Sequence, residues 1–189
     1  PDLAPDILAR LPIKAHAVKG TCRAWRCGWK ETMVDVAALI RGAMAGGDKA
    51  TDAIWPMVRL LPSLGSVETG WLIAVLTWLA VRSVNRTAIA SAGGIGALVA
   101  LLSSDAPIAG NAANALTNVL SEHDPNRVAA REAGAVPLLV AMLRGGGVAA
   151  SKAADALTMI AGETGGRAAV AAETDAIRLL VGLLSRVEC

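Results

Sequence analysis

Residues 135–143 read AVPLLVAML, and the same pattern of apolar residues occurs at three other places in the chain. The related segments are AIWPMVRLL at 53–61, GIGALVALL at 94–102 and AIRLLVGLL at 176–184, so the spacing between successive copies is constant. Within each copy the apolar residues recur at i, i+3, i+4 and i+7, as on the buried face of a helix. An internal repeat with a period of 41 therefore organises most of the sequence.

Two further helices are predicted in each period. One is a longer helix after the quoted segment, which we call the third helix of the repeat, and it is seen in WLIAVLTWLA at 71–80, NAANALTNVL at 111–120 and KAADALTMIA at 152–161. The other is a short helix before the quoted segment, seen in NRTAIASAG at 85–93, NRVAAREAG at 126–134 and GRAAVAAETD at 166–175. We call this short helix the first helix of the repeat and the quoted segment the second helix. The same period relates NAANALTNVL to KAADALTMIA and NRTAIASAG to NRVAAREAG, whereas WLIAVLTWLA fits if one loop residue is dropped and GRAAVAAETD is the weaker match. Three helices per period predict a solenoid of stacked repeats.

The composition agrees with an all-α fold. Hydrophobic residues make up 54% of the 189 residues, yet the chain contains no Phe, no Tyr and only five Trp. Leu, Val, Ile and Ala must therefore fill the interior, and small aliphatic side chains suit closely packed helices. Glycine and proline gather between the apolar segments, where they predict turns.

Residues 126–143, NRVAAREAGAVPLLVAML, resemble the repeat of the armadillo family. That repeat joins an Asn-Arg-x-x-Ile-x-x-Ala-Gly approach to a Gly-Ala-Ile-Pro-x-Leu-Val-x-Leu-Leu helix. The resemblance covers about residues 50–189 and implies an armadillo-type α-solenoid, a right-handed superhelix of three-helix repeats. HEAT repeats are the alternative, but they lack the Asn-Arg and Ala-Gly marks. We expect the array to occupy residues 46–189, with about three and a half repeats.

Residues 1–45 do not follow the period and are expected to form a separate small helical module. Asp6-Ile7-Leu8-Ala9-Arg10-Leu11-Pro12 and Cys22-Arg23-Ala24-Trp25-Arg26 resemble an F-box, the module that docks to the Skp-type adaptor of cullin-based ubiquitin ligases. The resemblance implies an adaptor-docking set of Ile7, Leu8, Leu11, Pro12 and Trp25. The alternative is a plain helical cap that covers the first repeat.

A partner-binding groove is expected along the third helices, because stacked three-helix repeats leave these helices lining a concave surface. Polar or bulky residues among small apolar ones mark its exposed positions. These are Trp71 and Trp78 in the first repeat, Asn111, Asn114 and Asn118 in the next, and Lys152, Asp155 and Met159 in the third. Asparagine amides both donate and accept hydrogen bonds, which suits them to an extended peptide backbone.

Two alternatives limit this prediction. In the importin-α branch of the armadillo family, a Trp four residues before the asparagine helps to recognise basic import signals, but Asn114 occupies that place before Asn118. Recognition of an import signal is therefore not expected. For Trp71 and Trp78 the alternative is packing into the core, since the chain has no Phe or Tyr to fill space.

No catalytic, cofactor or metal site is predicted. The chain has two histidines, and His123 lies in the loop SEHDPNR, where a solvated side chain is expected rather than a general base. Three cysteines form an odd set that a helical array does not need as disulfides, which favours a reducing cytoplasmic or nuclear compartment. The apolar run 71–81 is too short to span a membrane.

These observations favour a protein–protein interaction scaffold or adaptor over an enzyme. Its expected partners are other proteins or extended peptides, together with the Skp-type adaptor if residues 1–45 dock to a ligase. A scaffold without a ligase link is the first alternative. A nucleic-acid-binding solenoid is the second, through the basic residues Arg10, Lys14, Lys19, Arg23, Arg26 and Lys30. The net charge of +2 argues against nucleic acid.

Overall fold

The computed structural model describes residue 43 and residues 48–184 of the chain. Within these residues every regular element is a helix, and no strand occurs. The elements are α3 (Asp48–Leu60), the 3-10 helix η1 (Leu61–Ser63), α4 (Ser66–Leu79), α5 (Ser83–Ser91), α6 (Gly94–Leu101), α7 (Ala106–Leu120), α8 (Asp124–Glu132), α9 (Ala135–Gly145), α10 (Gly147–Ala161), α11 (Thr164–Ala172) and α12 (Ala176–Leu184). The chain folds as an all-α solenoid.

The helix boundaries confirm the period that the sequence predicts. The second helices of successive repeats, α6, α9 and α12, begin at Gly94, Ala135 and Ala176, with the constant spacing of the repeat. The third helices α7 and α10 begin at Ala106 and Gly147, with the same spacing. The one-residue offset predicted near the start of the array is also present, because α4 begins one position closer to α7 than the period would place it.

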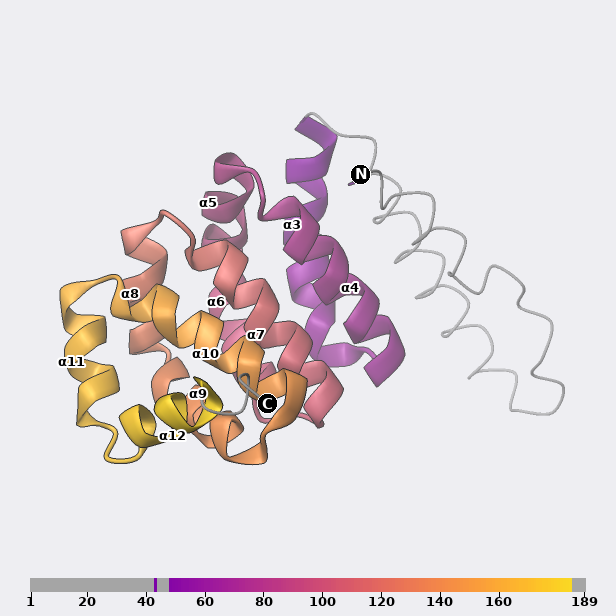
Figure 1. Cartoon of the computed structure of the whole chain (residues 1–189). Coiled ribbons are helices and arrows are strands. Elements are labelled where there is room, and N and C mark those ends of the chain that lie inside the picture. Colours follow the sequence, from indigo (N-terminus) through magenta and orange to yellow (C-terminus); the bar gives the residue numbers. More distant parts are fainter. Residues whose placement is uncertain (1–42, 44–47, 185–189) are drawn as a thin grey trace, which may run out of the picture.

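The repeats stack along the chain, so that equivalent helices lie next to one another. Figure 1 shows α3 and α4 at one end of the described array, α11 and α12 at the other, and α7 beside α10 between them. The third helix α7 packs against both α4 and α10. The third helices therefore form one continuous layer.

Glycine makes the corner between the first and second helices of the two central repeats. Gly93 before α6 and Gly134 before α9 both have a φ of 79°, in the left-handed region that other residues rarely adopt. In each case the corner lets a short first helix turn directly into the apolar second helix. The Ala-Gly mark of the sequence is thus a turn with a defined backbone geometry.

Aliphatic side chains fill the core in register from repeat to repeat. Ile54, Ile95 and Val136 occupy the same repeat position and are each at most 4% exposed. Leu139 and Val140 of α9 are also buried, as the apolar spacing predicts. The third helices add rows of alanine to this core, which allow close helix packing.

The fourth copy differs from this prediction. Its equivalent residues on α12, Ile177 and Val181, are 61% and 59% exposed. Helix α9 packs against α10 and α12, whereas no described helix follows α12. The apolar pattern alone therefore overestimates burial at the end of the described array.

Within the described residues no single helix is long and apolar enough to cross a membrane. Helices α5 and α6 reach that length and apolarity only together, and they are bent by 79° at their junction.

Candidate functional site

The layer of third helices presents one outward face, which we call the third-helix face. It is formed by Trp71, Ala74 and Trp78 on α4, by Asn111, Asn114 and Asn118 on α7, and by Lys152, Asp155 and Met159 on α10. All nine side chains are exposed or half-buried. On the opposite side of α7 and α10, Leu116 and Ile160 are fully buried. The structure therefore brings all the groove residues predicted from sequence onto one surface.

Small residues hold the three helices close together. A Cβ added at Gly110 of α7 would lie 3.5 Å from Cα of Ala149 on α10, so the two backbones nearly touch. A Cβ added at Gly70 of α4 would lie 3.7 Å from Cδ1 of Ile108 and 4.0 Å from Nδ2 of Asn111. Close backbone approach brings the exposed side chains of neighbouring helices within reach of one bound chain.

Asn111 and Asn114 have free amide groups. Asn111 is exposed and Asn114 is half-buried, and neither side chain makes a hydrogen bond within the described part of the chain. They share one face of α7 because they are three residues apart. Each amide can donate and accept a hydrogen bond, as the sequence predicts for recognition of an extended backbone.

Asn118 has a structural role that the sequence does not reveal. Its Nδ2 donates a hydrogen bond of 3.1 Å to the carbonyl oxygen of Thr77, in the last turn of α4. The backbone N–H that would normally reach this carbonyl belongs to Val81, and it bonds to Trp78 instead. Asn118 thus satisfies a helix-end carbonyl of the preceding repeat.

The two tryptophans of α4 differ in burial. Trp71 is half-buried and packs against the core, so the core-packing alternative fits it in part. Trp78 is 42% exposed, one turn beyond the exposed Ala74. Trp78 therefore offers the larger free aromatic surface to a partner.

The third helix of the next repeat, α10, adds an ion pair and a thioether. Nζ of Lys152 lies 3.8 Å from Oδ2 of Asp155, one turn apart on the exposed side of the helix. Met159 is half-buried and packs against the core. The two charges offset each other, so this end of the face has no net charge.

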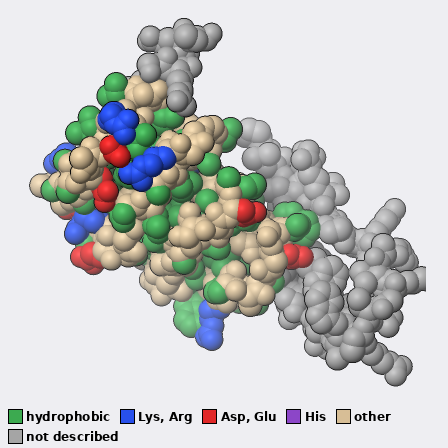
Figure 2. Space-filling view, turned by 90° about the horizontal axis from the view of Figure 1, so that it is seen from below, with side chains coloured by type: hydrophobic (Ala, Val, Ile, Leu, Met, Phe, Trp, Pro, Cys, Tyr) green, Lys and Arg blue, Asp and Glu red, His purple; other side chains and the backbone are tan. Residues whose placement is uncertain are grey.

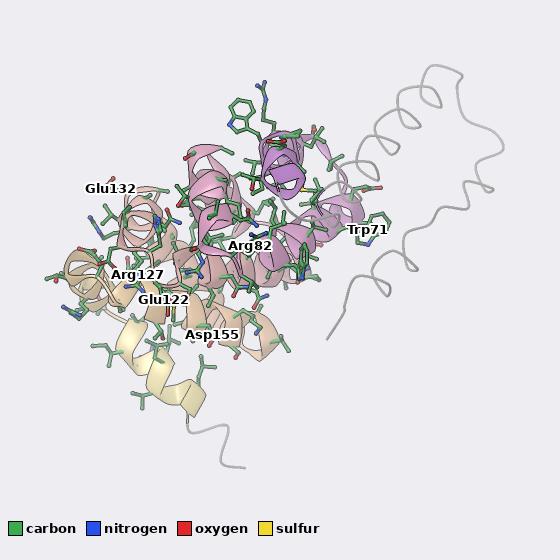
Figure 3. All side chains as sticks on the ribbon, turned by 90° about the horizontal axis from the view of Figure 1, so that it is seen from above. Trp71, Arg82, Glu122, Arg127, Glu132 and Asp155 are labelled. Atoms are coloured by element: carbon green, nitrogen blue, oxygen red, sulfur yellow. The ribbon has the colours of Figure 1, made fainter. Side chains whose placement is uncertain are left out.

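Most charged side chains of the two central repeats lie on the short first helices and their flanking loops. Arg127 pairs with Asp124 at 2.7 Å, and Nε of Arg131 lies 3.5 Å from Oε2 of Glu163. Figure 3 shows Arg127 and Glu132 around α8, whereas Trp71 and Asp155 project from α4 and α10. Hydrophobic and neutral atoms predominate on the side seen in Figure 2, with charged side chains in small groups.

His123 lies in the loop before α8, as the sequence predicts, but its side chain is not freely solvated. It is half-buried and caps α8, because its Nδ1 accepts a hydrogen bond of 3.3 Å from the backbone N–H of Asn126. Its Nε2 lies 3.3 Å from Oγ1 of Thr87 in the preceding repeat. Asp124 and Pro125, which the sequence analysis places in the loop SEHDPNR, form the first turn of α8.

Other residues singled out from the sequence do not join the third-helix face. The adaptor-docking set Ile7, Leu8, Leu11, Pro12 and Trp25 lies outside the described residues. Among the described residues no group of three or more His, Cys, Asp or Glu side chains is placed to hold a metal ion.

Two apolar residues at the edge of the third-helix face escaped the sequence analysis. Val67, four residues before Trp71, is 60% exposed, and Val148, four residues before Lys152, is 78% exposed. The available signal was an apolar residue that continues the spacing of the exposed stripe towards the start of each third helix. Both valines are small and apolar, so the rule that polar or bulky residues mark the exposed positions does not include them.

No family model matches the sequence, and none of the curated proteins does. Solved structures with the same fold exist. One engineered protein superposes with a TM-score of 0.67 at 28% identity over 94% of this chain, which spans 42% of that protein. A second has a TM-score of 0.69 at 26% identity, with 95% of this chain and 80% of that protein covered. A designed armadillo repeat protein, solved in complex with the peptide (KR)4, has a TM-score of 0.63 at 19% identity, covering 95% and 69% of the two chains. This chain therefore shares the fold of armadillo-repeat solenoids.

Proposed function

We propose that the chain is a protein-binding scaffold, not an enzyme, and that its third-helix face holds an extended segment of a partner protein. The observation that carries the proposal is the pair of free amides on α7. Asn111 and Asn114 make no hydrogen bond within the described residues, on a helix whose other side is fully buried. An extended peptide has unpaired backbone N–H and C=O groups that such amides can satisfy.

Two further observations support this function. The face lies on three helices that pack side by side, with the backbones of α7 and α10 close together, and a surface that is already folded loses less conformational entropy when it binds a partner. A protein of the same fold, the designed armadillo repeat protein, binds the peptide (KR)4. At 19% identity that likeness supports the type of ligand, a peptide, and not its sequence.

The test compares partner capture by the parent chain, a face variant and a control. The face variant is Asn111→Ala with Asn114→Ala, and the control is Ala100→Ser with Ala141→Ser on exposed positions of α6 and α9. We expect a partner captured from cell extract and then purified to bind the parent and the control equally. We expect the face variant to bind at least about tenfold more weakly while it unfolds at the same temperature. Equal affinity of all three proteins would place the binding site elsewhere.

A ligase link is a second, separate proposal that rests on sequence motifs alone. Leu11-Pro12 and Cys22-x-x-Trp25 are the F-box-like marks, and a plain helical cap is the alternative. If the segment docks to a ligase, the full chain co-purifies with a Skp-type adaptor, and Leu11→Asp with Trp25→Ala abolishes the association. No association at micromolar concentrations would leave the chain a scaffold without a ligase link.

A further inference from the structure

The third-helix face has an ordered pattern of side chains that indicates what kind of peptide fits it. Equivalent positions of α4, α7 and α10 are related by the repeat, so each row across the face takes one residue from each helix. The first row, near the start of the three helices, is Val67, Pro107 and Val148. All three are apolar and exposed, with Val67 at 60% and Val148 at 78%.

The last row, near the end of the helices, is also uncharged. It consists of Trp78, Asn118 and Met159. Trp78 exposes 42% of its surface, and the amide of Asn118 already bonds to Thr77. Between these rows lie Trp71 and Ala74 on α4, the free amides of Asn111 and Asn114 on α7, and the Lys152–Asp155 ion pair on α10. The face thus combines two uncharged rows, mostly apolar, with a central pair of unpaired hydrogen-bonding groups.

Charge is nearly absent from the three helices that form the face. The sequence of α7, APIAGNAANALTNVL, has no charged residue at all. Helix α4 has only Glu68, and α10 has Lys152 and Asp155, which pair with each other at 3.8 Å. These three helices therefore present no cluster of unpaired charges of one sign to a ligand.

We infer that the third-helix face selects an extended peptide segment with uncharged side chains, and that it discriminates against basic and acidic segments. This inference rests on the proposed function and concerns the chemistry of the partner. A Lys, Arg, Asp or Glu side chain that docked beside α7 would lose water without gaining an opposite charge from that helix, which is unfavourable. An aliphatic or aromatic side chain would instead cover Trp78 or the exposed valines and gain from burial.

The geometry also limits the length of the recognised segment. Packed helices have axes about 8–10 Å apart, so crossing from α4 to α10 takes about 16–20 Å. An extended chain rises about 3.3 Å per residue, so five or six residues cross the described face. Hexapeptides are therefore a suitable probe.

The first experiment selects a displayed library of random hexapeptides against the full-length chain. We expect the enriched sequences to lack Lys, Arg, Asp and Glu and to contain at least one large apolar residue. Their affinity should change by less than about twofold between about 0.05 and 0.5 M salt, because no ion pair is screened. It should fall at least about tenfold in Trp78→Ala and in Asn111→Ala with Asn114→Ala.

The outcomes separate this inference from the proposed function. Enriched sequences that are rich in one charge but still depend on Asn111 and Asn114 would overturn the uncharged-partner inference and leave the scaffold proposal standing. Enriched sequences that bind the face variants as well as the parent would contradict the proposed binding site itself. A folded chain that enriches no sequence would contradict both.

A second experiment tests the charge argument by a gain of binding. Asn111→Asp with Asn114→Asp adds two carboxylates to the uncharged helix α7, and Ala100→Asp with Ala141→Asp adds the same charge to exposed positions of α6 and α9. We expect the peptide (KR)4 to bind the parent and the control weakly and the face variant at least about tenfold more tightly. Tight binding of (KR)4 by the parent would overturn the inference.

Discussion

The junction between α7 and α8 and the junction between α10 and α11 join successive repeats in two different ways. We call them the first and the second junction. At the start of α8, Asn126 is 2% exposed and its Nδ2 donates to the carbonyl of Val119 at 2.9 Å. At the start of α11 the equivalent residue is Gly166, whose backbone N–H donates to Oε2 of Glu163 at 2.7 Å. The first junction is held by an amide side chain, and the second by backbone packing and a carboxylate. The same position of the repeat therefore helps to hold the junction in both cases, although its residue type differs.

One feature is common to both junctions. The residue that follows Asn126 or Gly166 is an arginine, and its guanidinium donates to a carbonyl at the end of the preceding third helix. Arg127 reaches Leu120 at 3.1 Å and Arg167 reaches Ala161 at 3.5 Å. These carbonyls have no partner within their own helix. The arginine therefore anchors each repeat in both cases, and only its neighbour differs.

The largest loss of stability is expected when the residue type of the first junction is placed at the second junction. A Cβ added at Gly166 would lie 1.9 Å from the carbonyl oxygen of Ile160, which is backbone and cannot turn away. Gly166→Asn, the residue of the other junction, should therefore destabilise the chain by about 2–4 kcal/mol because α11 must move off α10. Urea unfolding of parent and variant measures this difference.

The control for this substitution is another helical glycine. Gly96 is exposed on α6, and a Cβ added there meets nothing within 4 Å. Gly96→Ala should stabilise the chain by up to about 1 kcal/mol through helix propensity alone. If Gly166→Asn unfolded at the same urea concentration as the parent, close packing would not hold the second junction.

A smaller loss is expected when the amide of the first junction is removed. Asn126→Ala leaves the buried carbonyl of Val119 without its side-chain donor, which should cost about 1–3 kcal/mol. Asn114→Ala is the matched control, because that amide makes no hydrogen bond within the described residues. Its stability should stay within about 0.5 kcal/mol of the parent. Equal losses in the two variants would show that the Asn126 amide is not the stabilising group.

The sequence predicts the repeat well because the repeat is a local pattern. Apolar spacing, the constant offset between copies and the Ala-Gly corner can each be read from short stretches of the chain, and the structure confirms them. The pattern fails for Ile177 and Val181, because their burial depends on a helix that must follow α12. Burial at the end of a solenoid is a property of the neighbouring repeat, which a single copy of the pattern cannot reveal.

The candidate site is predictable as a surface and less so as a set of contacts. Helical spacing correctly places Asn111, Asn114 and Asp155 on the outward side of their helices. It does not show that Asn118 bonds to Thr77, because that contact joins two different repeats. The cap at His123 is similarly hard to predict, because histidine is an uncommon helix cap. The structure reveals this cap through the hydrogen bond from the backbone N–H of Asn126.

Removing the helix cap that His123 provides at the first junction should lower the free energy of unfolding by a moderate amount. Nδ1 of His123 accepts a hydrogen bond from the backbone N–H of Asn126, so His123→Ala leaves one donor at the start of α8 without a partner. We expect a loss of about 0.5–2 kcal/mol in the free energy of unfolding. Asn is a strong helix cap, so His123→Asn should recover most of this loss. If Asn and Ala destabilised the chain equally, the contact of His123 with Thr87 would be the more important one.

The smallest effect is expected at the second junction and only in acid. The pKa of Glu163 is lowered from its ordinary value of 4.5, first by the hydrogen bond from the backbone N–H of Gly165, and further by Gly166 and Arg131. A carboxylate whose pKa is lower in the folded state contributes stability above its unfolded pKa, and this contribution is lost as the pH falls through the folded value. The amide of Asn126 does not titrate, so the first junction lacks this dependence.

Glu163→Gln should therefore reduce the difference in unfolding free energy between pH 7 and more acidic solutions below about pH 4.5. The measurement is urea unfolding at several pH values for the parent and the variant. Asp175→Asn is the comparison, because hydrogen bonds from Arg178 and then Arg144 also lower the pKa of Asp175, at a site away from the junction. If the parent and Glu163→Gln lost stability equally on acidification, while Asp175→Asn lost less, the acid sensitivity would belong to the loop before α12 and not to the junction between α10 and α11.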